Sequence, residues 1–369
     1  MPYKVITGEK PRINEIQKYL NMLAEGQHLS VDDSGRVFQM IMAGGATPSQ
    51  IAATLMGLRI NGETVDEITG AAMVLRRKAK KIDIPEELQK NLIDTCGTGG
   101  DKKGSYNIST TVAIVLAACG LPVAKHGNRA VSSASGSADV LKALGVNIEI
   151  SAPEDVIRCL SEAGICFLMA PNYHSAMKNV GPTRLELGMR TIFNVLGPLI
   201  NPAAPKRQIL GVYSKDLVEP LAHVLKNLGS EKAWVVHGLD GMDEISIAEK
   251  TFVAELKDGV VSTFQIDPKK YGLALEIEEE KDEEGNVIEQ KDPLKGGDAI
   301  HNARKMKELL QGEESAYRNA VILNAAAGLV VGGATDDIKK GVEIASDAID
   351  SGKALDTLKK LVAVSNLSL

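Results

Sequence analysis

Apolar residues recur every three to four positions through the first quarter of the chain, which is the spacing of amphipathic helices. Four segments share the pattern: residues 13–23, a segment starting at Leu29, residues 46–58 and residues 63–77. Ser30 and Thr47 stand where N-terminal caps are expected, and Pro48 suits a first helical turn. The pattern therefore predicts that residues 12–80 form a compact, wholly helical module.

Short apolar runs alternate with longer amphipathic segments from Leu92 onward, a pattern typical of parallel βαβ units. The short runs predict strands starting at Leu92 and Leu121, and at residues 146–150, 165–169, 208–213 and 233–237. The longer segments predict helices at residues 112–120, a segment ending at Leu144, and residues 154–163, 216–228, 298–310, 316–331, 336–351 and 355–369.

Residues 171–196 interrupt this alternation with another helical stretch, so we expect the chain to return to the first module there. The expected fold class is α/β, with a small all-helical domain and a larger domain whose mostly parallel sheet is flanked by helices. We assign residues 1–90 with 171–196 to the helical domain, and residues 91–170 with 197–369 to the α/β domain. Several crossings between the two domains would permit hinge closure around a ligand.

Composition is consistent with this architecture. A chain of 369 residues is long enough for two domains, and 44% hydrophobic with 4% aromatic residues fits an aliphatic α/β enzyme. No apolar run approaches the roughly 20 residues of a membrane span, and the first residues lack an apolar signal core. We therefore expect a cytoplasmic protein without a membrane partner. The four cysteines show no Cys-x-x-Cys spacing and read as reduced core thiols.

The formal net charge of −6 argues against a nucleic-acid partner, because phosphate backbones are held mainly by clustered Lys and Arg. It does not exclude a small phosphorylated ligand, since a local pocket of amides and cations can hold an anion inside an acidic protein. Residues 276–292 form a charge run with few apolar residues, which we interpret as a solvated insertion rather than a metal site.

Glycines at the end of the strand that starts at Leu92 give the first indication of function. Residues 97–101 read Gly-Thr-Gly-Gly-Asp, and uncovered backbone amides in such a loop can hold an anion. Residues 105–111 add hydroxyl and amide side chains, followed by a helix whose N-cap would be Asn107 or Ser109. A helix N-terminus also favours phosphate. Three glycines alone could equally make only a tight turn, and the spacing matches neither a Rossmann nor a Walker loop.

A second block, residues 121–139, runs from a strand into a polar loop and then a helix. Residues 125–132 read Lys-His-Gly-Asn-Arg-Ala-Val-Ser. Together with the glycine loop and the Asn-x-Ser-Thr at residues 107–110, this block resembles the anthranilate phosphoribosyltransferase family over nearly the whole chain. The resemblance implies transfer of phosphoribose from phosphoribosyl pyrophosphate to anthranilate, with Mg²⁺ as cofactor. It also implies a homodimer through the helical module.

The resemblance assigns residues to three parts of the site. Those implied to bind phosphoribosyl pyrophosphate are Gly97, Gly100, Asp101, Ser105, Asn107, Ile108, Ser109, Thr110, Lys125, His126, Gly127, Asn128, Arg129, Ala130, Val131, Ser132, Ser133 and Ser137. Those implied to bind anthranilate are Gly97, Asn128, His174 and Arg184. The implied metal ligands are Ser109, Asp243 and Glu244.

These residue types suit the chemistry. The donor is a polyanion that needs anion receptors more than a strong base, so we expect catalysis by positioning and electrostatics without a dedicated catalytic acid or base. A lone Asp-Glu pair such as Asp243 and Glu244 is usually a solvated loop, but its place after the strand at 233–237 favours a Mg²⁺ site. The planar donors of Arg184 suit a carboxylate. For His126 and His174, a role as hydrogen-bonded structural residues is favoured over a catalytic one.

Three positions depart from the family pattern: Lys102 where glycine is common, Ala134 where lysine is frequent, and Ser175 where proline is usual. Lys102 could supply the charge that Ala134 lacks. Two other functions remain open, a pyrimidine-nucleoside phosphorylase, which shares the fold, and a non-catalytic relative that binds nucleic acid. The Arg-Ala-Val-Ser continuation favours the transferase over the first, and the net charge argues against the second.

Overall fold

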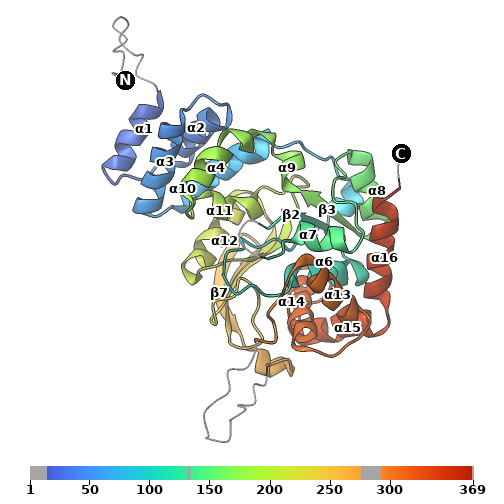
Figure 1. The fold of residues 1–369 in the computed structure, drawn as a ribbon. Helices are drawn as coiled ribbons and strands as arrows, with labels where there is room; N and C mark the ends of the chain where they lie inside the picture. Colours follow the sequence, from blue (N-terminus) through green and yellow to red (C-terminus); the bar gives the residue numbers. More distant parts are fainter. Residues whose placement is uncertain (1–14, 131–133, 276–291, 368–369) are drawn as a thin grey trace, which may run out of the picture.

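The computed structural model describes residues 15–130, 134–275 and 292–367. Four helices at the start of the chain form a module at one end of the molecule (Figure 1). They are α1 (Glu15–Ala24), α2 (Val31–Met42), α3 (Pro48–Asn61) and α4 (Val65–Lys78). The prediction of a helical start is thus confirmed for the described residues, with boundaries within a few positions of those expected.

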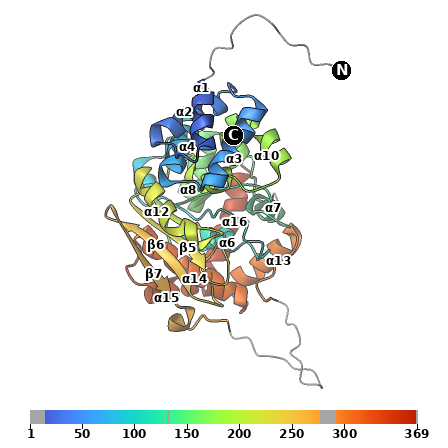
Figure 2. The same ribbon diagram turned by 90° about the vertical axis from the view of Figure 1, so that its left-hand side faces the viewer.

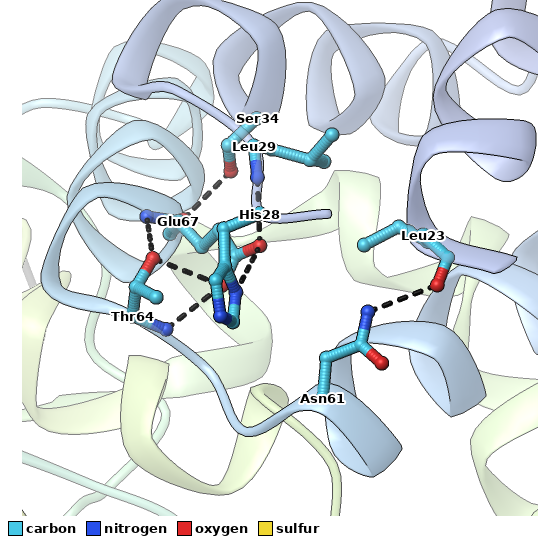
Figure 3. A network of polar contacts seen from close by, with 7 residues as sticks. All are labelled: Leu23, His28, Leu29, Ser34, Asn61, Thr64 and Glu67. Carbon is cyan, nitrogen blue, oxygen red and sulfur yellow. Dashed lines mark hydrogen bonds and ion pairs between the residues drawn. The ribbon is translucent and has the colours of Figure 1, made fainter. Parts of the chain in front are cut away.

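Side-chain caps set where these helices begin. Ser30 accepts a hydrogen bond from the backbone N–H of Asp33, and Thr47 forms a capping box with Gln50, so both predicted caps are confirmed. Thr64 forms a second capping box with Glu67. The Glu67 carboxylate is only 1% exposed, and it also accepts from the Leu29 N–H at 2.9 Å (Figure 3). Glu67 therefore fixes the start of α4 against the start of α2.

The second part of the chain is built on one seven-stranded sheet with the order β3-β2-β1-β4-β5-β6-β7. The strands are β1 (Ile93–Asp94), β2 (Val123–Gly127), β3 (Ile165–Met169), β4 (Arg207–Gly211), β5 (Lys232–Gly238), β6 (Thr251–Lys257) and β7 (Val260–Ile266). The first five run parallel, and β6 and β7 are antiparallel to their neighbours. The expected fold class, a helical domain plus a mostly parallel sheet flanked by helices, is confirmed.

Helices cover both faces of this sheet. The helices of this part of the chain are α5 (Glu86–Gln89), α6 (Ile108–Ala118), α7 (Ser137–Ala143), α8 (Pro153–Ala163), α12 (Val218–Asn227), α13 (Ala299–Leu310), α14 (Ala316–Gly332), α15 (Ile338–Asp350) and α16 (Lys353–Ser365). On β5, Trp234 and Val236 join the core under α6 and α14, whereas Ala233 and Val235 join the core under α12. That second core is continuous with the helical module, and α12 lies between α4 and the β5–β6 pair (Figure 2).

The structure differs from the sequence predictions at three points. Residues 146–150 are not a strand, although Val146, Ile148 and Ile150 are buried, because alternating burial also arises in an irregular segment laid over a core. The β6–β7 hairpin was not expected, yet its turn residues Asp258 and Gly259 have φ values of 51° and 74°, typical of a two-residue type I′ turn. This Asp-Gly pair between apolar runs is the signal that could have revealed the hairpin.

The third correction concerns residues 171–196, which form short pieces rather than one helical stretch. These are α9 (Ala170–Tyr173), η1 (Ser175–Asn179), α10 (Gly181–Leu187) and α11 (Phe193–Leu196). Val180, Ile192 and Phe193 pack in the core shared with α1 to α4. This packing supports the proposed assignment of the segment to the helical domain.

The structure also bears on the sequence expectations for the cysteines, the acidic run and membrane spans. All four cysteines are free, and Cys159 and Cys166 are buried. Residues 276–291 of the acidic run lie outside the described residues, whereas its last residue, Asp292, is exposed and accepts from the Leu294 N–H at 2.9 Å. Among the described residues, no helix has the length and apolar character needed to cross a membrane.

Candidate active site

A pocket opens at the carboxyl edge of the sheet beside β1 and β4. The chain goes from β1 to β2 and β3 on one side and then to β4 on the other, so the strand order reverses at β1. Open α/β sheets bind ligands at such a switch point. Eight residues line the pocket: Thr95, Gly97, Ser109, Val112, Ile209, Gly211, Glu244 and Asn324. Three of the predicted site residues, Gly97, Ser109 and Glu244, thus meet in one place.

The glycine loop lies against the end of β4. Gly99 and Gly100 have φ values of 64° and 81°, which glycine adopts without strain. The Thr98 N–H donates to the Gly211 carbonyl at 2.8 Å, which holds the loop to the neighbouring strand. The Arg190 guanidinium donates to the Gly100 carbonyl and lies 4.0 Å from the centre of the Tyr213 ring. A cationic side chain therefore lies against the loop that was predicted to hold an anion.

Asp101 closes this loop. One carboxylate oxygen accepts from the Lys103 N–H at 3.0 Å. The other is buried and has no hydrogen-bond partner within the described part of the chain. A buried, unsatisfied carboxylate oxygen is costly unless a ligand or ion completes its shell.

The second predicted turn leads into α6. Ile108, Ser109 and Thr110 form its first turn, and Asn107 stands at the N-cap position without making a side-chain cap. The Asn107 carboxamide instead donates to the Ser135 carbonyl at 3.3 Å and accepts from Asn302 at 2.9 Å. Ser105 pairs with Lys295 in an antiparallel bridge.

The third predicted block ends β2 and starts α7. Lys125 is 2% exposed, and its ammonium donates to the Thr95 carbonyl at 3.2 Å and to the Ser109 hydroxyl at 3.3 Å. His126 and Gly127 complete β2, Asn128 and Ala130 follow it, and Ser137 is the first residue of α7. Val131, Ser132 and Ser133 lie outside the described residues. Arg129 points elsewhere in this structure, forming a surface ion pair with Glu149 at 3.2 Å.

Asp243 and Glu244 lie in the loop after β5 and face the glycine loop and α6. Glu244 accepts from the Ser109 N–H at 3.1 Å. Burial raises the pKa of both carboxyls well above the ordinary range, and the neighbouring Asp101 raises the pKa of Asp243 further. Lys125 partly offsets the rise for Glu244. Three carboxyl groups, those of Asp101, Asp243 and Glu244, therefore lie near the Lys125 ammonium, and this excess of acidic groups suits a bound cation.

The metal ligands expected here suit Mg²⁺ better than a metal ion that is coordinated by protein side chains alone. No group of three or more His, Cys, Asp or Glu side chains within residues 15–130, 134–275 and 292–367 is arranged to hold an ion. Magnesium usually takes one or two carboxylates and completes its shell with water and substrate oxygens. Asp243, Glu244 and the Ser109 hydroxyl meet that requirement beside the pocket.

His126, in β2, and His174, which follows α9, lie together. Their rings meet edge to face with centroids 5.3 Å apart, and His126 Nδ1 lies 3.1 Å from the Gly197 carbonyl oxygen. Burial lowers the pKa of His126 to about 3 and that of His174 to about 4, so both are neutral at pH 7. In both rings Nε2 is buried and lacks a partner among the described residues.

The other two predicted anthranilate contacts, Arg184 and Asn128, have separate partners. The Arg184 guanidinium sits 5.0 Å from the centre of the Phe193 ring, while the Asn128 side chain accepts from the Arg129 N–H at 2.8 Å. No hydrogen bond joins Arg184 to Asn128 in the described structure. Any ligand contacting both would have to bridge them.

Five residues that sequence patterns did not indicate hold the predicted ones in place: Asp94, Arg190, Asn201, Asn302 and Asn324. Asp94 is fully buried, accepts from Asn201 at 2.8 Å and from the His126 N–H at 3.3 Å, and has its pKa raised by burial to about 6. The Asn324 carboxamide pairs with both the N–H and the carbonyl of Ile245, next to Glu244. Only Asp94, at a strand end, carried a usable local signal.

Comparison with known proteins agrees with this architecture. Residues 89–355 match the model of the α/β domain of a glycosyl transferase family, and residues 17–79 match that family's helical bundle domain. The fold and the pocket thus define a two-domain glycosyl transferase.

Individual relatives are more specific. Anthranilate phosphoribosyltransferase of Azospirillum brasilense is 53% identical over 97% of this chain and 95% of its own length, and that of Bradyrhizobium sp. (strain ORS 278) is 52% identical over 96% and 100%. The chain belongs to the anthranilate phosphoribosyltransferase family. The resemblance seen in the sequence motifs is confirmed.

Two solved structures extend the likeness to three dimensions. The anthranilate phosphoribosyltransferase from Thermus thermophilus superposes with a TM-score of 0.84 at 37% identity, covering 94% of this chain and 99% of that one. The Saccharomyces cerevisiae enzyme in complex with PRPP and Mg superposes with a TM-score of 0.82 at 28% identity, covering 95% and 97%.

Proposed function

We infer that this enzyme transfers the phosphoribosyl group of phosphoribosyl pyrophosphate to the amine of anthranilate, giving N-(5′-phosphoribosyl)anthranilate and pyrophosphate in tryptophan biosynthesis. The observation that carries this proposal is the meeting of the glycine loop, the first turn of α6 and Glu244 in one pocket at the strand switch point. Lys125, from the third predicted segment, donates to Ser109 in the lining of that pocket. Family membership supplies the identity of the two substrates.

The donor side of the reaction needs charge stabilisation. As pyrophosphate leaves, negative charge grows on its oxygens and positive charge grows at the ribose carbon. The amides of the glycine loop, the N-terminus of α6 and the Lys125 ammonium are fixed before substrate arrives, so they stabilise that charge with little reorganisation. We assign phosphoribosyl pyrophosphate to these groups and to the remaining predicted donor residues.

We assign Mg²⁺ to Asp243, Glu244 and Ser109. The ion, when bound, supplies positive charge against the pyrophosphate oxygens. The chain contributes the fixed carboxylates, and the Ser109 N–H orients the Glu244 carboxylate from the first turn of α6. The Saccharomyces cerevisiae relative in complex with PRPP and Mg supports the shared donor and metal site.

We assign anthranilate to a position between the pocket and the helical module, with contacts from Gly97 in the pocket lining and from Asn128, His174 and Arg184 outside that lining. Anthranilate carries an aromatic amine of low basicity and a carboxylate, so orientation matters more than removal of a proton. Two neutral buried imidazoles suit an aromatic ring, and the Arg184 guanidinium suits the carboxylate. A Saccharomyces cerevisiae relative in complex with 4-fluoroanthranilate supports an acceptor of this class.

We further propose a homodimer through the helical module. Large apolar side chains remain exposed there: Ile60 at 75%, Leu185 at 83% and Met189 at 42%. Exposed apolar groups gathered on one module are typical of a subunit interface. Light scattering at micromolar concentration would test the dimer, and cell fractionation would test the cytoplasmic location expected from the sequence.

One assay tests the reaction. Purified protein, Mg²⁺, phosphoribosyl pyrophosphate and anthranilate are mixed, and the fluorescence of anthranilate is followed as it is consumed. We expect consumption that requires all three additions, and pyrophosphate released in equal amount. Consumption of a pyrimidine nucleoside with inorganic phosphate, without activity on anthranilate, would instead favour the phosphorylase.

A further inference from the structure

The buried side chain of Asn302, in α13, contacts the second substrate-binding turn and a neighbouring backbone segment at the same time. Asn302 is 2% exposed. Its Nδ2 donates to Asn107 Oδ1 at 2.9 Å, and its Oδ1 accepts from the Gly297 N–H at 2.8 Å. The Asp298 cap, which accepts from the His301 N–H at 2.8 Å, fixes where α13 begins and hence where Asn302 projects. One carboxamide therefore joins two separate parts of the chain.

The neighbouring segment, residues 292–298, is itself paired with the turn. The Tyr106 N–H donates to the Leu294 carbonyl and the Gly296 N–H to the Gly104 carbonyl, both at 2.9 Å. The Lys295 ammonium adds a hydrogen bond to the Lys103 carbonyl at 2.8 Å. We call residues 292–298 the strap.

Close packing keeps the strap at a fixed distance from the turn before α6. A β-carbon on Gly296 would lie 2.9 Å from the Ser105 carbonyl oxygen and 3.1 Å from the Asn302 side chain. No larger residue fits there without displacement of the turn or of Asn302. The strap, the turn and Asn302 thus form one rigid contact.

This contact decides the orientation of the Asn107 carboxamide. Because Asn302 presents an N–H to it, Asn107 must turn its oxygen toward Asn302. Its Nδ2 then faces the Ser135 carbonyl at 3.3 Å, on the loop that follows β2. A flipped Asn107 would place two N–H groups against each other. Asn107 in its observed orientation joins two of the segments assigned to phosphoribosyl pyrophosphate.

We propose that Asn302 is a positioning residue for the phosphoribosyl pyrophosphate site, which acts through Asn107 and does not touch the substrate itself. This rests on the proposed function, and deepens it by naming a residue from the C-terminal helices that sets the geometry of the donor site. Its loss would loosen the turn before α6 while leaving the acceptor side of the pocket intact.

A double-mutant cycle tests the proposal. Asn302→Ala, Asn107→Ala and the double variant are compared by KM for each substrate and by calorimetric Kd for phosphoribosyl pyrophosphate. We expect Asn302→Ala to weaken binding of phosphoribosyl pyrophosphate about tenfold and to leave the anthranilate KM within about twofold. In the Asn107→Ala background, Asn302→Ala should cause little further loss of binding. Equal donor losses in both backgrounds, or no donor loss at all, would overturn the proposal.

Two further variants separate positioning from folding. Met306→Ala in the same helix removes a fully buried side chain, so it should lower stability without changing the donor Kd. If Asn302→Ala does not fold, Asn302→Asp keeps the acceptor for Gly297 and replaces only the donor facing Asn107. If wild-type protein binds phosphoribosyl pyrophosphate but does not react with anthranilate, the proposed function is wrong. The double-mutant cycle, measured as Kd for phosphoribosyl pyrophosphate, would still test the role of Asn302. Wild-type protein that does not bind the donor overturns both.

Discussion

A β-carbon on Gly211 would lie 1.6 Å from the backbone carbonyl oxygen of Asp243. The end of β4 and the carboxylate loop after β5 are therefore in direct backbone contact, and only glycine permits this. The same Gly211 carbonyl accepts the hydrogen bond of Thr98 in the glycine loop. The glycine loop and the proposed metal loop thus share one contact point on β4.

Gly211→Ala should accordingly push the carboxylate loop out of place. We expect a loss of stability of about 1–3 kcal/mol, turnover lowered by about tenfold or more, and a higher Mg²⁺ concentration at half-maximal rate. Gly181→Ala is the control, because a β-carbon there meets no atom within 4 Å. A Gly211→Ala enzyme with wild-type Mg²⁺ dependence would contradict the role given to this contact.

Lys102 has a φ of 64°, a conformation in which a lysine is strained and a glycine is not. This gives a physical reason for the glycine common at this position in the family. Lys102→Gly should leave the free energy of unfolding unchanged or raise it by about 1 kcal/mol, whereas Lys103→Gly next to it should lower it. Urea unfolding measures both. If the KM for phosphoribosyl pyrophosphate rises in Lys102→Gly but not in Lys103→Gly, the Lys102 charge contributes to binding that substrate.

His126 and His174 make stability depend on pH. Their pKa values are about 3 and about 4 in the folded protein, against an ordinary value of 6.5. At pH values between the folded and the ordinary pKa, the unfolded chain binds more protons than the folded one. The free energy of unfolding therefore falls as the pH falls below 6.5. His174→Asn should make the decline between pH 6.5 and 5 shallower by about 1 kcal/mol per pH unit. Parallel curves for wild type and variant would show that His174 does not contribute.

Arg184 is predicted to serve the acceptor and not the donor. Arg184→Ala should remove a charge-assisted contact of roughly 1.5–3 kcal/mol, so the anthranilate KM should rise by about 10- to 150-fold with the donor KM little changed. Asp243→Asn should do the reverse, raising the Mg²⁺ and donor requirements. Titration of each substrate at saturation of the other distinguishes the two. A donor defect in Arg184→Ala would reverse our assignment of the pocket's two sides.

The acidic run, residues 276–292, and the strap share Asp292, so variants can test whether the strap's role begins at that residue. Replacing residues 276–291 with a short Gly-Ser link while keeping Asp292 should leave turnover near wild type, since their composition cannot build a core. Asp292→Ala should raise the donor KM, because the Asp292 carboxylate fixes the first turn of the strap. Steady-state kinetics of both variants settles the point.

Local information in the sequence determined most of the helices, their caps at Ser30 and Thr47, the parallel strands β1 to β5 and the motifs that identify the family. Each of these depends on residues a few positions apart, so periodicity and hydrogen-bonding chemistry are enough to find them. The fold class followed because alternating strands and helices leave few arrangements of a sheet.

Only the tertiary structure decided which distant residues meet. Residues 146–150 have the alternation of a strand but find no strand partner, and pairing rather than pattern makes a strand. Arg190, Asn302 and Asn324 lie 79 to 195 residues in sequence from the groups they bind, and nothing local marks a buried amide as the partner of a particular loop. The sequence alone therefore indicated the groups proposed to meet substrate, whereas only the folded structure shows which side chains hold those groups in place.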